Sequence, residues 1–488
     1  MEEHSYQKIL KVTSLFGSVQ LLTAITGILK TKCIALFLGA NGIGIYGVLQ
    51  STLSIISTLS NIGLNSSAVR EIAQNEDNEL NLTLNIIRKC AIASGITGLL
   101  FTILFARQLS LFIFNSPAYS ICFIWLSLAI LFDQLSSANL AILQGLRQLN
   151  YLAKANIAGG ILGLTISVPI FFIFGEKGIT PVLMLTSLTL LLRSWYYARK
   201  IPVLKMPVSW TTCWRVGGNM IKLGMTMTLT GVIGIGCTYL FRIWLSRIFG
   251  FEAVGYFNAA FLIIEGYVAM FFTAMSTDYF PRLSKIHTEE KKRDKLVNEQ
   301  SEIGIILLTP LLIILITLSD LIICLLYSSA FLPASAILKY SLIGVLFKAI
   351  SFPFSYVFIA KSDKKLFFFE ELFSWSYILL ALILSSHYGG IDCIGIGYSI
   401  GYFFSAIQSI LLNKYIYHTQ ITKNTVFLAS GSLILLIVSL WASHIESVFF
   451  RYLLFILLIT GSCLISFYIL NKRTGCWQKI QRYIARRH

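Results

Sequence analysis

Long runs of apolar residues, separated by short polar or charged clusters, recur along the entire chain. A helix needs about 20 mostly apolar residues to cross the hydrocarbon core of a bilayer. Runs of this kind lie at 12–38, 43–69, 84–106, 117–143, 152–174, 179–198, 217–249, 254–280, 300–327, 334–360, 366–386, 393–413, 425–443 and 450–470. The pattern therefore predicts an all-α polytopic membrane protein with about fourteen transmembrane helices.

The composition agrees with this class. The 488 residues are 56% hydrophobic and only 12% charged, with a mean hydropathy of +0.76, whereas soluble proteins are about 25% charged. The net charge of +17 could indicate nucleic-acid binding. However, the Lys and Arg residues form short clusters between apolar runs, which is typical of loops in contact with anionic lipid headgroups.

The basic clusters also predict the orientation, because Lys and Arg are enriched on the cytoplasmic side of a membrane. With a cytoplasmic N-terminus, the clusters at 193–222, 282–295, 361–365 and 472–487 all fall on that side. This predicts an even number of crossings and two cytoplasmic termini. The connections are short, so we expect no separate soluble ATPase, kinase or glycosyltransferase domain.

Two stretches in different halves of the chain resemble each other: ALFLGANGIGIYGVLQSTLSII at 35–56 and LSRIFGFEAVGYFNAAFLIIEG at 245–266. In both, a long apolar segment ends in a glycine-marked turn and a second long segment returns. A shift of 211 positions pairs Gly39 with Gly250, Gly44 with Gly255 and Tyr46 with Phe257. Six predicted crossings separate the stretches, so the repeats run in the same direction.

The repeat predicts the domain organisation. We expect two pseudo-symmetric six-helix lobes, at 1–205 and 206–420, and an extra helix pair with a basic cytoplasmic tail at 421–488.

Gly42, Gly44 and Gly47 form a literal G-x-G-x-x-G. A dinucleotide-binding loop would need a preceding strand and an αβ fold around it, whereas membrane-length apolar segments flank this motif. We interpret the glycines as permitting a tight reversal between two helices. The sequence has no C-x-x-C or H-E-x-x-H motif. We expect no catalytic activity, no metal and no cofactor.

Polar residues concentrate in the predicted segments one, two, seven and eight, which are the first pair of each lobe. Polar side chains within a bilayer face protein or water, so we expect these four helices to line a cavity. The alternative is that single Ser and Thr residues join helices by hydrogen bonds. The polar residues expected to contact a substrate are Gln20, Asn61 and Asn258.

Lys30, Lys32 and Arg242 lie inside segments one and seven, and Arg247 lies near the end of segment seven. A charge at the bilayer centre costs ~2.5 kcal/mol or more. Under the shift of 211, Arg242 aligns with Thr31, so both lobes present cations at the same depth. The pattern indicates an electropositive pocket for a phosphate-containing headgroup. Snorkelling to the outer headgroups is the alternative, above all for Arg247.

Intramembrane acids are the candidates for coupling transport to an ion gradient. Glu265 in segment eight and Asp133 in segment four could bind H⁺ or Na⁺, or Glu265 could pair with a cation. Further intramembrane charges are Asp320, Lys339 and Lys348.

The stretch FLGANGIGIYGVLQSTLSIISTLSNIGLNSSAVREIAQ at 37–74 resembles the polysaccharide-transporter branch of the multidrug/oligosaccharidyl-lipid/polysaccharide (MOP) flippase superfamily, which flips O-antigen and capsule repeat units. In topology the resemblance covers the whole chain. It implies a flippase that moves undecaprenyl-pyrophosphate-linked oligosaccharide across the bacterial inner membrane by alternating access. It also implies a cationic cavity at Lys30, Lys32 and Arg242, although the family often has Arg in its first helix.

The resemblance further implies the partners: the lipid-linked oligosaccharide, membrane lipids, and the polymerase and other polysaccharide-assembly proteins, without nucleic acid. A lipid II flippase of peptidoglycan synthesis shares this plan and stays open as an alternative. A multidrug or cation antiporter would favour acidic and aromatic cavity residues. A membrane polymerase would need a large outside loop, which the sequence lacks.

Overall fold

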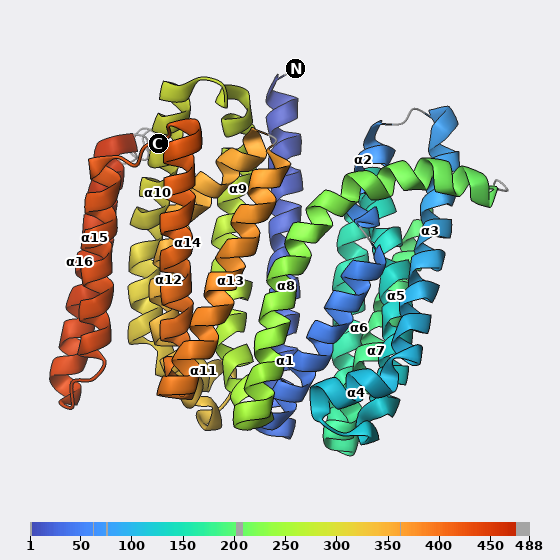
Figure 1. Ribbon diagram of the computed structural model, residues 1–488, viewed down its shortest axis with the longest axis horizontal. Helices are drawn as coiled ribbons and strands as arrows, with labels where there is room; N and C mark the ends of the chain where they lie inside the picture. Colours follow the sequence, from blue (N-terminus) through green and yellow to red (C-terminus); the bar gives the residue numbers. More distant parts are fainter. Residues whose placement is uncertain (1, 62, 75–76, 202–207, 362, 475–488) are drawn as a thin grey trace, which may run out of the picture. The chain divides into compact units, whose positions relative to one another are not determined.

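A computed structural model of the chain describes residues 2–61, 63–74, 77–201, 208–361 and 363–474. Every regular element among these residues is a helix. The chain divides into two compact units, Met1–Gly255 and Tyr256–His488, and the division falls inside a helix. Figure 1 shows the helices of each unit.

The first unit is a bundle of long helices. α5 packs against α3 and α7, and α6 packs against α1 and α7. Its helices are α1 (Glu2–Asn61), α2 (Leu64–Gln74), α3 (Asp77–Leu104), α4 (Ala106–Phe114), α5 (Ser120–Gly145), α6 (Leu149–Phe174), α7 (Ile179–Ala198) and most of α8 (Trp210–Phe261), with the 3-10 turns η1 (Pro117–Tyr119) and η2 (Gly175–Gly178). A core of buried small and aliphatic side chains joins α2, α3 and α5.

The second unit contains the end of α8 and the helices that follow. They are the π-helix η3 (Leu262–Val268), α9 (Ala269–Ile286), α10 (Glu290–Thr317), α11 (Ser319–Leu326), η4 (Ser329–Phe331), α12 (Pro333–Ala360), α13 (Lys364–Gly389), η5 (Ile391–Cys393), α14 (Ile394–Tyr417), α15 (Lys423–Ala442) and α16 (Val448–Thr474). α14 packs closely against α12 and α13 because Gly395, Gly397 and Gly401 present only backbone to them. α10 packs against α12, α15 and α16.

Eleven stretches of the described residues are long and apolar enough to cross a membrane. Three of them contain a break that divides them into two helices: Ile25–Asn61 at Gly39, Leu149–Ala198 at η2 and Gly231–Ile286 at Gly250. Divided in this way, the spans agree in number with the fourteen predicted segments, and the predicted all-α polytopic membrane protein is confirmed. The cytoplasmic position of both termini and the lobe boundaries stay predictions.

Three short helices, α2, α4 and α11, were not predicted. The predicted segment at 43–69 crosses the end of α1 at Asn61 and the start of α2 at Leu64. The apolar run at 300–327 is divided at Leu318 into α10 and α11, and α4 lies where we expected a loop. α4 has 9 residues and α11 has 8, too few to be recognised by a pattern that searches for membrane-length runs.

The two glycine turns identified in the sequence have the same backbone conformation. Gly39 breaks α1 with φ 66° and Gly250 breaks α8 with φ 82°, in the region that only glycine adopts without strain. In Figure 1, α1 runs away from the N-terminus and turns back on itself. The reversal therefore lies at Gly39, and the glycines of the G-x-G-x-x-G lie in the returning arm, not in the turn as we interpreted them.

Within the first unit, the returning arm of α1 also contacts α8 through glycine. The Cα of Gly44 lies against the carbonyl of Phe251, and the Cα of Gly255 lies against the carbonyl of Ala40, so neither position has room for a Cβ. The shift of 211 positions pairs Gly44 with Gly255 and Ala40 with Phe251, so the two contacts are equivalent in the repeat. The two helices thus cross at a reciprocal backbone contact, which we call the glycine crossing.

Candidate functional site

The basic residues predicted for the pocket lie on α1 and α8, and these helices contact each other within the first unit. On the returning arm of α1, Thr52 Oγ1 is hydrogen-bonded to Tyr239 Oη of α8 at 3.0 Å, and both side chains are buried. Arg242 follows one helical turn after Tyr239. On α1 itself, Lys30 Nζ lies 5.2 Å from the centre of the Tyr46 ring on the opposite arm, which is a favourable cation–π distance.

Lys30, Lys32 and Arg242 are all partly exposed. The three basic side chains therefore lie on two helices that contact each other, and none of them is fully buried. Of the predicted polar contacts, the Gln20 side chain lies outside the described residues. Asn258 is partly buried in the last turn of α8, which belongs to the second unit.

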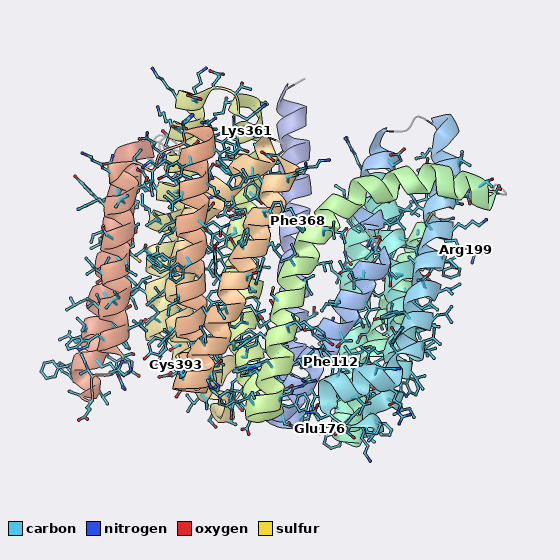
Figure 2. The ribbon with its side chains drawn as sticks, in the orientation of Figure 1. Phe112, Glu176, Arg199, Lys361, Phe368 and Cys393 are labelled. Carbon is cyan, nitrogen blue, oxygen red and sulfur yellow. The ribbon has the colours of Figure 1, made fainter. Side chains whose placement is uncertain are left out.

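Arg247 is engaged by another element. Its Nη2 donates to the carbonyl of Phe112, and its guanidinium lies 5.1 Å from the centre of the Phe112 ring. Phe112 lies near the C-terminal end of α4, where helix carbonyls attract cations. Figure 2 places Phe112 at the same end of this unit as Glu176 and opposite to Arg199. Arg247 thus joins α8 to α4 at that end.

A polar cluster joins α1 to α5 in the first unit. Ser57 and Asn61 lie four residues apart, hence on one face of α1. Gln134 Nε2 donates to the backbone carbonyl of Ser57 at 2.6 Å, and Asp133 directly precedes Gln134 in α5. The Asn61 Oδ1 atom is buried and has no hydrogen-bond partner among the described residues. Two predicted residues, Asn61 and Asp133, are therefore neighbours of Ser57.

Glu265 forms an ion pair in the second unit. Lys348 Nζ of α12 lies 3.2 Å from both carboxylate oxygens of Glu265, and Tyr398 Oη of α14 donates to Oε1 at 2.7 Å. Lys348 also lies 5.3 Å from the centre of the Tyr402 ring. Glu265 lies on the π-helix η3, a local distortion that is frequent at functional sites.

The sequence pointed to Glu265 and Lys348 separately, as intramembrane charges, but not to their pairing or to Tyr398. It also missed Glu370 of α13. This side chain is 2% exposed and accepts a hydrogen bond from Ser355 Oγ of α12 at 2.9 Å. Among the described residues, no three His, Cys, Asp or Glu side chains gather as a group that could hold a metal ion.

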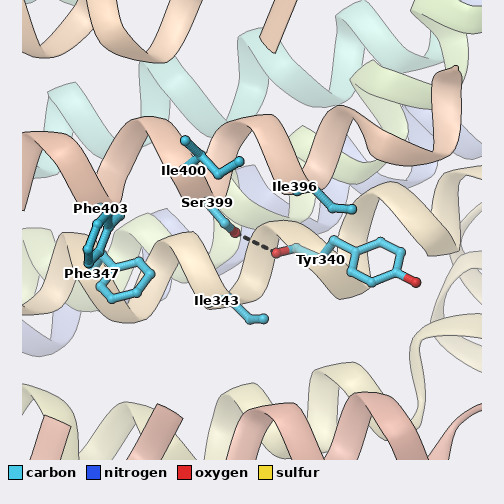
Figure 3. A pocket seen from close by; sticks show the side chains of 7 residues that line it. All are labelled: Tyr340, Ile343, Phe347, Ile396, Ser399, Ile400 and Phe403. Carbon is cyan, nitrogen blue, oxygen red and sulfur yellow. Dashed lines mark hydrogen bonds between the residues drawn. The ribbon is translucent and has the colours of Figure 1, made fainter. Parts of the chain in front are cut away.

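A small apolar pocket lies between α12 and α14 (Figure 3). Its lining residues are Tyr340, Ile343, Phe347, Ile396, Ser399, Ile400 and Phe403. Ser399 is the centre of a literal G-x-S-x-G at 397–401, but it lies inside α14 and its Oγ donates to the Tyr340 carbonyl at 2.6 Å. A nucleophilic serine needs a sharp strand-to-helix turn, so this motif is structural and the pocket suits hydrocarbon.

Solved structures of transporters share this fold. The lipid II flippase MurJ in its inward closed conformation matches with a TM-score of 0.68 and 16% identity, covering 95% of this chain and 99% of that chain. An inward-facing multidrug resistance MATE family transporter of the MOP superfamily matches with a TM-score of 0.66 and 14% identity, covering 85% and 96%. The chain therefore has the fold of MOP-superfamily transporters.

Sequence comparison gives the family. The family described as polysaccharide biosynthesis protein matches residues 33–336, and the chain belongs to it. The chain is also 20% identical over 362 residues to a lipid III flippase of Escherichia coli (strain K12), covering 72% of this chain and 86% of that protein. The lipid III flippase of Shigella flexneri matches to the same extent. The resemblance to MOP flippases is confirmed, and its O-antigen and capsule branch stays a prediction.

Proposed function

We propose that the protein flips a lipid-linked oligosaccharide from the cytoplasmic to the periplasmic leaflet of the bacterial inner membrane. The observation that carries this proposal is the contact between α1 and α8, two helices that each carry partly exposed basic residues within their membrane spans. Membership of a polysaccharide biosynthesis family and similarity to proteins named lipid III flippase support it.

The proposed substrate is an undecaprenyl-pyrophosphate-linked O-antigen or capsule repeat unit. Its isoprenoid tail stays in the bilayer while the head enters the protein. Lys30, Lys32 and Arg242 offset the cost of removing the pyrophosphate from water. Gln20, Asn61 and Asn258 contact the sugars by hydrogen bonds. The polymerase and other polysaccharide-assembly proteins are the proposed partners on the periplasmic side.

A second candidate is the flipping of another polyprenyl-pyrophosphate glycan, such as lipid III or lipid II. The names of the E. coli relative and of the MurJ structure favour it. The same cations would bind the same pyrophosphate, so the two candidates differ only in the sugar. Competition between unlabelled lipid-linked glycans for flipping distinguishes them.

We also propose that a proton or sodium gradient drives the cycle, with Glu265 and Asp133 as the acids identified from the sequence. In the second unit the charge of Glu265 is compensated by Lys348. Protonation of Glu265 would release the lysine, so the pair can respond to a change in proton occupancy.

The test is a flipping assay in proteoliposomes with a fluorescent lipid-linked oligosaccharide. Lys30→Ala combined with Arg242→Ala should lower the initial rate at least about tenfold, since each removes a charge-assisted contact to pyrophosphate. Lys177→Ala, which removes an exposed basic residue of η2, is the control and should keep the rate. Unchanged flipping in the double variant would refute the pocket.

A further inference from the structure

Glu370 is the most deeply buried carboxylate that lacks a balancing cation among the described residues of the second unit. Its side chain is 2% exposed. Oε1 accepts a hydrogen bond from Ser355 Oγ at 2.9 Å, whereas Oε2 is buried without a hydrogen-bond partner in the described part of the chain. A buried carboxylate oxygen with neither a donor nor a counter-charge is strongly unfavourable as a bare anion.

The surrounding helices supply further oxygen atoms, and none of their described cations is paired with Glu370. From α14, Ser409 Oγ lies 3.2 Å from Ser355 Oγ, and Gln408 Nε2 donates to the Glu370 backbone carbonyl at 3.3 Å. This bond holds the Gln408 amide beside Glu370, and its Oε1 is buried without a partner among the described residues. Asn413 of α14 donates to the Phe354 carbonyl of α12 at 3.1 Å, and its Oδ1 is also buried without a hydrogen-bond partner in the described part of the chain. Two buried oxygens without a partner, Glu370 Oε2 and Gln408 Oε1, thus belong to residues that are joined across the contact of α13 and α14.

The charged residues near Glu370 add further negative charge, which favours the binding of a cation. Glu371 follows directly, and its Oε2 accepts from Trp375 Nε1 at 3.1 Å. Lys348 of α12 interacts with Glu371, but its ammonium is paired with Glu265. Lys348 therefore interacts with Glu265 and Glu371, whereas no cation among the described residues is paired with Glu370. The groups that α14 presents here, Gln408, Ser409 and Asn413, are uncharged.

We propose that Glu370 is a binding site for one monovalent cation, H⁺ or Na⁺, completed by the oxygens of Ser355 and Gln408. One carboxylate with hydroxyl and amide oxygens is a hard, singly charged ligand set, which suits Na⁺ and not a transition metal. When Na⁺ enters, the protonated carboxyl loses its proton to water and the carboxylate binds the ion, so charge is conserved.

The position of Glu370 on α13 suits exchange of the cation with one side of the membrane. Glu370 lies in the second turn of α13, two residues beyond Phe368, which Figure 2 places towards the Lys361 end of this unit and away from Cys393. The sequence predicts that the basic end around Lys361 is cytoplasmic. The inference rests on the proposed function, in which such a site would carry the driving ion.

The test measures cation occupancy without any substrate. Full-length protein in nanodiscs is titrated from about pH 5 to pH 10 in choline chloride and in sodium chloride, and the infrared band of protonated carboxyl groups is followed. We expect a band that Glu370→Gln removes and the matched variant Glu371→Gln keeps. If Na⁺ binds, sodium lowers the titration midpoint and releases about one proton per protein. If only H⁺ binds, both salts give the same titration.

The proposal is overturned if Glu370→Gln leaves both the carboxyl band and the sodium response unchanged, or if Glu371→Gln removes the band. Should Glu370→Gln fail to fold, Gln408→Met removes one oxygen at similar volume and should weaken proton or sodium binding about tenfold; unchanged binding refutes the site. Flipping is measured separately. If the protein binds the cation but flips no lipid-linked sugar, the proposed function is refuted and the cation site is not.

Discussion

At the scale of single residues, two carboxylates of the second unit differ in how their charge is compensated. Glu265 is 40% exposed and has a lysine and a tyrosine as partners, whereas Glu370 is 2% exposed and has only hydroxyl and amide neighbours. Compensation, and not depth alone, sets how readily each acid exchanges a cation. The Glu265–Lys348 pair is therefore expected to contribute to stability in addition to its proposed part in coupling.

This role of the Glu265–Lys348 pair can be measured. Lys348→Met leaves Glu265 without its cation and should lower the free energy of unfolding by about 1–3 kcal/mol, between the values of exposed and buried pairs. Thermal unfolding monitored by intrinsic fluorescence gives the change. Adding Glu265→Gln should recover most of the loss, because no charge is then left unpaired. A double variant as unstable as Lys348→Met would contradict this.

Part of the candidate site was proposed from the sequence at this scale and stays a prediction. Lys30, Arg242 and Glu265 stand out because charges are rare inside long apolar runs. The Glu265–Lys348 pair could not be predicted, because its members are 83 residues apart and no local pattern encodes their contact. Glu370 was missed because it follows Lys364 and Lys365 closely. That position resembles the charged end of a helix and not a buried site.

At the scale of elements, the repeat was visible because glycine is distinctive in sequence and in conformation. The pairing of Gly39 with Gly250 has its counterpart in the positive φ of both residues. The role of Gly44 was not predictable in the same way. Residue 44 must be glycine because a Cβ there would collide with the carbonyl of Phe251, which lies on another helix. A contact between residues that are far apart in the sequence leaves no periodic pattern in it.

The glycine crossing gives a prediction for α1 and α8. Gly44→Ala forces the helices apart, since its Cβ would collide with the Phe251 carbonyl, and should destabilise the protein by about 1–3 kcal/mol. Gly236→Ala is a matched control in α8, because a Cβ added there would meet no atom of the described residues within 4 Å. The control should be neutral or stabilising by up to about 1 kcal/mol. Equal melting temperatures for both variants would exclude the crossing.

At the scale of the whole molecule, the C-terminal helix pair is attached to the rest of the second unit through α10. Asn298 binds the connection between α14 and α15, donating to the Gln420 carbonyl at 2.7 Å and accepting from the Thr422 amide at 2.8 Å. The fully buried Arg293 donates to Thr419 Oγ1 at 3.0 Å. These bonds make α15 and α16 an ordered part of the unit.

The attachment predicts a protease-sensitive variant. Asn298→Leu removes the bonds to Gln420 and Thr422 in the 418–422 connection and should accelerate its cleavage in limited proteolysis about tenfold or more, because local opening becomes easier. The exposed Asn424, mutated to Ala, is the control. Cleavage at the same rate in both variants would show that the connection is held by other contacts. Mass spectrometry of the fragments identifies the site.

The glycine crossing also has a consequence for biosynthesis. The ribosome releases the α1 hairpin early, but the partners of Ala40 and Gly44 on α8 emerge only when about half of the chain has been made. Until then the flat backbone surface of the hairpin faces lipid or the insertion machinery. Correct assembly of the first unit therefore depends on a contact that closes late, and translation arrest before α8 would leave an insertion intermediate that crosslinking through Cys33 could capture.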